Sequence, residues 1–138
     1  MNKAKDSRPL ANKRLLLVDN YPDPDRLTLQ HLLAEGAHVT LECHALAATQ
    51  VVLAVPEGFD AVIIDLELPE SDCLQAASML RLAGYARLLV AIGTFSTEEK
   101  RQRLLLAGFD AVLLNATSSA YFIETIGRLL KEPGSASS

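Results

Sequence analysis

The sequence predicts an α/β domain in which helices cover both faces of a five-stranded parallel sheet. Short apolar runs alternate with longer helix-like segments five times along the chain. These runs carry few charges until the residue at which each one ends, which is typical of strands buried on both faces. The chain has 138 residues, of which 49% are apolar, and this is enough for one such domain and too little for two.

The first half of the pattern contains two strands and two helices. Residues 15–18 are continuously apolar and predict a buried strand, after which Pro24 opens a helix that stops at Gly36. Residues 38–42 alternate apolar and polar side chains, which indicates a more exposed strand. An Ala/Val-rich helix is expected at 46–55, where a proline and a glycine follow.

The third and fourth strands are the next two apolar runs, at 61–64 and 88–92. Between them, residues 66–72 contain a proline and are expected to form a loop, and the helix at 74–82 ends at a glycine. This order of elements requires parallel strands joined by helical crossovers.

The last third of the chain repeats the alternation. Thr97 begins a charged helix that ends at Gly108, residues 111–114 form the fifth strand, and a final helix covers 119–131. The segment 58–65 is nearly repeated at 108–115. We interpret the repeat as the same helix-to-strand junction used twice in one sheet, which places Asp65 and Asn115 at equivalent strand ends.

Composition excludes several classes of protein. We expect a tail or linker at 1–12, one domain at 13–132 and a flexible tail at 133–138, where Gly and Ser prevail. The apolar runs are far shorter than the ~20 residues of a membrane span, and the first residues lack the apolar core of a signal peptide. The net charge of −4 argues against nucleic-acid binding by this domain. A cytoplasmic domain is therefore expected.

Two acidic residues mark a candidate site at the carboxyl ends of the strands, where open parallel sheets bind their ligands. A flavodoxin-like (βα)5 sheet with strand order 2-1-3-4-5 makes the first and third strands neighbours. Asp19 and Asp65, which follow these strands, would then lie close together. Two carboxylates so placed repel each other unless a cation or a proton intervenes. Mg²⁺ suits such oxygen ligands.

Competing sites for this fold lack their motifs. The chain has no Gly-x-x-x-x-Gly-Lys-Ser/Thr phosphate loop and no Gly-x-Gly-x-x-Gly dinucleotide motif. The acidic, proline-rich segment 20–24 does not suit a flavin phosphate, and the Asp-x-His-x-x-Gly motif of cobalamin domains is absent. Cys73 has no neighbour in the sequence that would activate its thiol, and we interpret it as a packing residue.

Three segments resemble the receiver domains of two-component response regulators: 15–20, 61–72 with its Asp-Leu-x-Leu-Pro-x-x-Asp motif, and 107–110. The likeness covers about residues 13–132. It implies that Asp65 accepts a phosphoryl group from a histidine kinase or a phosphotransfer protein, with Mg²⁺ as cofactor. It also implies that Asp19 and Asp65 bind the metal together with the backbone carbonyl of Glu67.

Several positions depart from the pattern of that family. Asn20 replaces the second acid of the metal-binding pair, and Gly93 replaces the hydroxyl residue that contacts the phosphoryl group. Thr94 lies one position later, where a register shift would bring it into use. Asn115 replaces a lysine, and Val112 replaces the aromatic switch residue. The resemblance therefore implies an atypical receiver.

Two functions follow, with a third kept as a remote alternative. The chain is expected to be a phosphoacceptor rather than an enzyme, with at most weak self-phosphorylation and autodephosphorylation, within a response regulator or a hybrid sensor kinase. The alternative is a pseudo-receiver that acts as an interaction or dimerisation module whatever its phosphorylation state. A homodimer would use the helix at 97–108, the strand at 111–114 and the helix at 119–131. The third hypothesis, a small-molecule-binding domain, is opposed by the missing phosphate loop.

Overall fold

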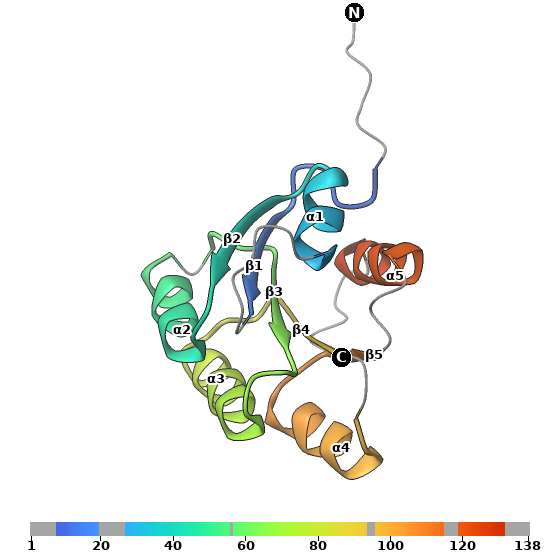
Figure 1. The fold of residues 1–138 in the computed structure, drawn as a ribbon. Helices are drawn as coiled ribbons and strands as arrows, with labels where there is room; N and C mark the ends of the chain where they lie inside the picture. The colour runs from blue at the N-terminus through green and yellow to red at the C-terminus, as the bar shows by residue number, and fades with distance from the viewer. Residues whose placement is uncertain (1–7, 20–26, 56, 94–95, 115–118, 132–138) are drawn as a thin grey trace, which may run out of the picture.

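The computed structural model describes residues 8–19, 27–55, 57–93, 96–114 and 119–131. Within these ranges, strands and helices alternate five times (Figure 1). The strands are β1 (Arg14–Val18), β2 (His38–Glu42), β3 (Ala61–Asp65), β4 (Leu88–Gly93) and β5 (Ala111–Leu114). The helices are α1 (Leu27–Ala34), α2 (Ala45–Ala54), α3 (Glu70–Leu82), α4 (Glu98–Ala107) and α5 (Ser119–Lys131).

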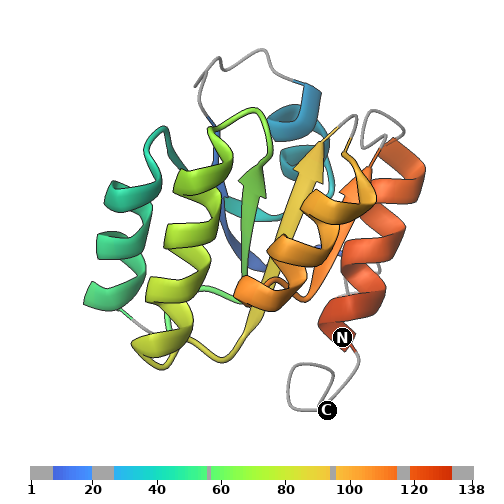
Figure 2. The ribbon, with the colours of Figure 1, turned by 90° about the horizontal axis from the view of Figure 1, so that it is seen from below.

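The strands form one parallel sheet in the order β2-β1-β3-β4-β5, as the sequence predicts. Helices α1 and α5 pack on one face, and α2, α3 and α4 lie side by side on the other (Figures 1 and 2). The flavodoxin-like doubly wound fold is therefore confirmed. Within the described ranges, no helix has both the length and the apolar character that a membrane span requires.

The apolar runs supply both halves of the core because successive strand residues point to opposite faces. Leu16, Val62 and Leu89 face the α2–α4 layer, whereas Leu15, Ile63 and Val90 face α1 and α5. β1 and β3 are buried along almost their whole length, but the edge strand β2 alternates between half-buried and exposed positions. This difference explains why only β2 shows alternating polarity in the sequence.

The repeated segment forms the same junction twice at the amino ends of the strands. Asp60 accepts a hydrogen bond from the backbone N–H of Arg14 in β1 and donates its own N–H to the Arg14 carbonyl. Asp110 makes the same reciprocal pair with Leu89 in β4. Each aspartate therefore fixes the start of the neighbouring strand, as the repeat indicates.

The pKa of Asp60 makes this junction sensitive to acid. Burial alone would raise the pKa, but hydrogen bonds from the Arg14 side chain and backbone outweigh it and hold the pKa below the ordinary 3.8. A carboxylate whose pKa is lower in the folded state stabilises the fold above its unfolded pKa, and this contribution is lost as the pH falls through the folded value. We expect Asp60→Asn to lower stability at neutral pH and to flatten the acid limb of the stability profile. Urea unfolding at about pH 7 and about pH 3 tests this, and parallel profiles would contradict it.

The structure differs from the sequence-based expectation at residues 8–12, which the sequence analysis assigns to a tail. Leu10 is completely buried in the core beneath α1 and α5. Arg8 donates a hydrogen bond of 2.8 Å to the carbonyl of Ala34 at the end of α1. Pro9 lies so close to Gly127 in α5 that a Cβ there would be 2.7 Å from the proline ring. The buried Leu10, together with the contacts of Arg8 and Pro9, thus attaches this segment to the domain.

Helix α3 also begins earlier than expected. The sequence places residues 66–72 in a loop, but the helix starts at Glu70, directly after Pro69. Proline suits the start of a helix, and Glu70 and Asp72 in the first turn favour its positive end. The loop after β3 is therefore short, only residues 66–69, and this brings α3 close to Asp65.

Candidate functional site

The structure places Asp19 and Asp65 at the carboxyl ends of two adjacent strands. β1 and β3 are paired in parallel with Val18 opposite Ile64, and each aspartate is the next residue along its strand. The two side chains are 1% and 6% exposed. The topology therefore brings together the two carboxylates that the sequence singles out.

Asp65 is tied closely to the loop that follows it. Its Oδ1 accepts a hydrogen bond of 2.8 Å from the backbone N–H of Glu67, and its carbonyl accepts one of 3.1 Å from Leu68. On the other side, the N–H of Leu66 donates to the carbonyl of Ile92 in β4. These contacts fix both the orientation of the carboxylate and the path of the loop.

The oxygen atoms at the ends of β1 and β3 are suitable ligands for a hard divalent cation. Asp19 and Asp65 offer carboxylate oxygens, and the backbone of Glu67 lies in the same loop. Within the described part of the chain, no three His, Cys, Asp or Glu side chains are grouped as a metal site. An ion bound here would therefore depend on a backbone carbonyl and water for its remaining ligands, as Mg²⁺ commonly does.

Cys73 lies beside the site as a buried packing residue. Its Sγ is 3.9 Å from the carbonyl oxygens of both Asp65 and Leu68. Burial raises the pKa of the thiol to about 11. The thiol therefore stays protonated at neutral pH, and it has neither the acidity nor the exposure of a nucleophilic cysteine.

Three of the site positions singled out in the sequence, Asn20, Thr94 and Asn115, fall outside the described residues. Val112 and Gly93, the other two positions at which the sequence departs from the receiver pattern, are described. Val112 lies half-buried in β5 and packs against the core of the α2–α4 face. Gly93 ends β4, where a Cβ would lie 3.1 Å from the Cβ and Cδ1 atoms of Leu66. The Leu66 side chain therefore packs against the place where a side chain at position 93 would begin.

We expect Gly93→Thr to destabilise the fold by about 1–3 kcal/mol, because it adds atoms to a filled space. Leu66→Ala should relieve this clash, so the double variant should be more stable than the sum of the two single changes indicates. Urea unfolding of the four proteins measures the coupling. Additive effects would show that Leu66 does not limit position 93.

A groove of about 630 Å³ runs between α2 and α3 beside the loop 66–69 that follows Asp65. Its lining includes Leu46, Leu68, Pro69, Asp72 and Met79. The sequence analysis did not identify this feature, although α2 carries no charged residue and Leu46 and Leu53 are exposed on it. The lack of charged residues in this surface helix was the signal in the sequence that could have indicated the groove.

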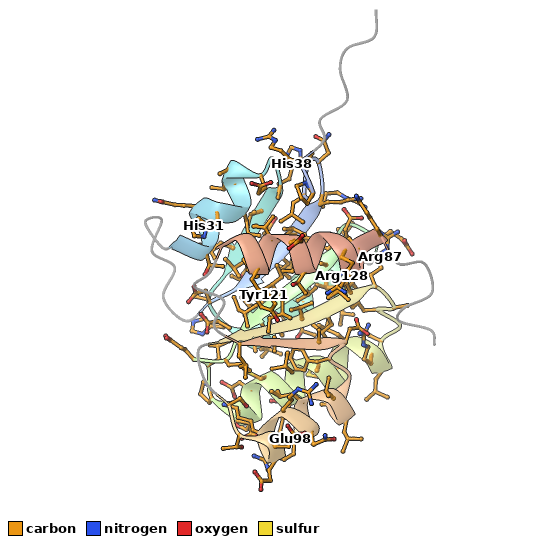
Figure 3. All side chains as sticks on the ribbon, turned by 90° about the vertical axis from the view of Figure 1, so that its right-hand side faces the viewer. His31, His38, Arg87, Glu98, Tyr121 and Arg128 are labelled. Atoms are coloured by element: carbon orange, nitrogen blue, oxygen red, sulfur yellow. The ribbon has the colours of Figure 1, made fainter. Side chains whose placement is uncertain are left out.

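Two arginines of α4 form ion pairs within the chain: Arg101 pairs with Glu98 of the same helix, and Arg103 pairs with Glu70 of α3. The homodimer through α4, β5 and α5 stays a prediction. Figure 3 shows Glu98 at the outer surface of α4, across the sheet from Tyr121 and Arg128 of α5. Among the described residues of α4 and α5, two large apolar side chains are exposed: Leu106 is 86% exposed and Tyr121 is 48% exposed.

Comparison with protein-family models gives no match, and comparison with curated proteins gives no significant match either. Solved structures do match. The receiver domain of a sensor histidine kinase from Pseudomonas aeruginosa PAO1, with magnesium coordinated in its active site cleft, aligns with a TM-score of 0.75 and 22% identity. The alignment covers 88% of this chain and 100% of that one.

Two further receiver structures give the same result. The chemotaxis protein CheY4 of Vibrio cholerae aligns with a TM-score of 0.70 and 17% identity, over 86% of this chain and 99% of that one. The beryllofluoride-activated receiver domain dimer of NtrC4 aligns with a TM-score of 0.73 and 17% identity, over 86% and 96%. The likeness seen in the sequence motifs thus extends to the whole sheet and its helices, and the chain has the fold of a response regulator receiver domain.

Proposed function

We propose that this chain is a receiver module of a two-component phosphorelay in which Asp65 is the phosphoacceptor. The observation that carries the proposal is the placement of Asp65 and Asp19, both buried, at the ends of adjacent central strands in a receiver fold. Its partner would be a histidine kinase or a phosphotransfer protein. The module would act in the cytoplasm, within a response regulator or a hybrid sensor kinase.

The reaction is the transfer of a phosphoryl group from a phosphohistidine nitrogen to a carboxylate oxygen of Asp65. The O–P bond forms as the N–P bond breaks, and the imidazole leaves with the electron pair. The Glu67 N–H holds Oδ1 and so fixes the orientation of the nucleophile. The short loop and the ends of the strands confine the approach of the donor to the carboxyl edge of the sheet.

Asp19, Asp65 and the carbonyl of Glu67 would hold Mg²⁺, and Asn20 stands where a further acid would add a ligand. When bound, the ion neutralises the negative charge that develops on the phosphoryl oxygens. Gly93 and Val112 provide no hydrogen-bond donor from their side chains. We therefore infer slow self-phosphorylation from small donors and slow autodephosphorylation, the behaviour of a phosphoacceptor rather than of an enzyme.

The test is intact-mass measurement after incubation with acetyl phosphate, with and without Mg²⁺. The proposal expects a phosphoryl-sized mass gain that requires Mg²⁺ and is abolished in Asp65→Asn. Asp72→Asn, which removes an exposed acid of α3, is the matched control and should behave like the unchanged chain. No gain with acetyl phosphate or with a phosphorylated phosphotransfer protein would contradict the proposal.

A second candidate function is a phosphorylation-independent interaction module. The packing of Leu66 against Gly93 favours it, because this packing occupies space at the phosphoryl-binding edge. Under this alternative, copies of the chain would pair through α4, β5 and α5, where Leu106 and Tyr121 are exposed. Sedimentation equilibrium distinguishes the two: a dimer that is independent of beryllofluoride and is lost in Leu106→Ser supports the module, whereas a monomer throughout contradicts it.

A further inference from the structure

A two-point ion pair links the start of α3 to the middle of α4. The Arg103 guanidinium donates from Nε to one carboxylate oxygen of Glu70 and from Nη2 to the other, at 2.5 and 3.1 Å. The two helices lie side by side in Figure 2. A planar guanidinium that grips both oxygens fixes the relative orientation of the two side chains better than a single contact does.

Glu70 is the first residue of α3 and directly follows the loop that is hydrogen-bonded to Asp65. The loop 66–69 is held by the bond from Glu67 N–H to Asp65 Oδ1 and by that from Leu68 N–H to the Asp65 carbonyl. The first turn of α3 is in turn fixed to the loop, because the N–H groups of Asp72 and Cys73 both donate to the Pro69 carbonyl. These hydrogen bonds therefore connect the Asp65 carboxylate, through the loop, to the first turn of α3, where Glu70 lies.

Arg103 lies on a well-packed part of α4, although about half of its own side chain is exposed. The adjacent Leu104 is completely buried, and the Thr97 side chain caps the helix by accepting a hydrogen bond of 3.1 Å from the N–H of Lys100. The hydrogen bond from Arg103 and the nearby positive charge of Lys100 hold the pKa of Glu70 below its usual value. The pair is thus ionised at neutral pH, and it joins two rigid helices rather than two mobile ends.

We propose that Glu70 and Arg103 are positioning residues that carry the state of Asp65 to α4. This inference rests on the proposed function of Asp65 as phosphoacceptor. When Asp65 becomes an acyl phosphate, its carboxyl oxygens lose the full carboxylate charge, and the charge-assisted hydrogen bond from Glu67 N–H weakens. The loop then relaxes, Glu70 shifts, and Arg103 transmits the shift to α4.

Among the described residues, neither Gly93 at the end of β4 nor Val112 within β5 offers a second polar route to α4. Gly93 has no side chain, and Val112 has no polar group with which to follow a phosphoryl oxygen. The Glu70–Arg103 pair, by contrast, is a direct polar connection between the acceptor loop and another helix. A contiguous set of packed and hydrogen-bonded groups is the physical requirement for such coupling.

The test follows amide chemical shifts by NMR while beryllofluoride and Mg²⁺ are added as a phosphoryl mimic. In the unchanged chain, both the loop 66–70 and α4 should shift. In Arg103→Gln, the loop shifts should remain and the α4 shifts should be lost. The charge exchange Glu70→Arg with Arg103→Glu should restore them. Arg101→Gln removes a neighbouring arginine whose partner lies within α4, so it should leave both responses intact.

The outcomes separate the coupling from the proposed function. If the loop shifts in all variants and α4 responds equally in Arg103→Gln, the pair does not transmit the state of Asp65, although the acceptor function stands. Failure of the charge exchange to restore the α4 response would also overturn the inference. If the loop of the unchanged chain shows no shift at all, the proposed function fails, and the coupling fails with it.

Discussion

We expect Mg²⁺ to stabilise the folded chain, and we expect replacement of Asp19 by asparagine to remove that stabilisation. An ion that binds only the native state raises the unfolding temperature by mass action. Asp19 and Asp65 are brought together only by the pairing of β1 with β3, so the unfolded chain has no equivalent site. Changes around metal sites lower affinity by about 10–100-fold even when they lie outside the ligand set. Loss of a ligand should therefore weaken binding at least as much.

Thermal unfolding over a Mg²⁺ titration measures this effect. Asp72→Asn is the matched control, because it removes the same charge from an exposed position on α3. The control should keep the full Mg²⁺ response, whereas Asp19→Asn should show almost none. An equal loss in both variants would mean that Mg²⁺ acts by screening the net negative charge, and that no site forms at the ends of the strands.

Replacing Arg81 by methionine is expected to cost about 2–4 kcal/mol of unfolding free energy. The Arg81 guanidinium donates to three backbone carbonyls, those of Gly108, Tyr85 and Arg87, at 2.8–2.9 Å. It also pairs with the Asp110 carboxylate at 2.9 Å and lies over the ring of Tyr85, 5.6 Å from its centre. Methionine preserves the apolar stem but leaves the three carbonyls without this donor, whereas Asp110 keeps the hydrogen bond from the Leu89 N–H.

Arg101→Met is the control for this prediction, because Arg101 makes only an exposed pair of 3.5 Å with Glu98 among the contacts that the structure gives it. A surface pair of this kind contributes about 0–1 kcal/mol. Lysine at position 81 should rescue little, because a single ammonium cannot reach acceptors arranged for a planar fork. Urea unfolding of the three variants tests the prediction, and similar losses for positions 81 and 101 would contradict it.

The sequence predicts the sheet and the position of the acidic pair because both depend on local signals. Each buried strand is a continuous apolar run, and each ends at a polar residue. The strand order comes from the flavodoxin-like arrangement that such alternation and the receiver resemblance indicate, and it brings Asp19 beside Asp65. Chemical roles for these residues remain proposals, since the fold fixes where a carboxylate lies and not what it binds.

The parts that could not be predicted depend on contacts between distant segments. Arg81 bonds to residues 4, 6, 27 and 29 positions away, and no periodicity marks such a centre. Leu10 is buried only because α1 and α5 leave a space that a preceding segment can fill. Arg103 looks like one charge among several on a solvated helix until α3 is placed beside it.

The junctions at Asp60 and Asp110 lie at the opposite end of the sheet from the candidate site. Both junctions lie where strands begin, and so do the arginines that pair with the two aspartates: Arg14 and Arg87 with Asp60, and Arg81 with Asp110. Asp19 and Asp65, by contrast, lie where strands end. Substitutions at the carboxyl ends of the strands therefore leave the hydrogen bonds that hold the amino ends of β1 and β4 unchanged. The sequence can therefore depart from the receiver pattern at a position such as Gly93 without losing the contacts that hold the amino ends of β1 and β4.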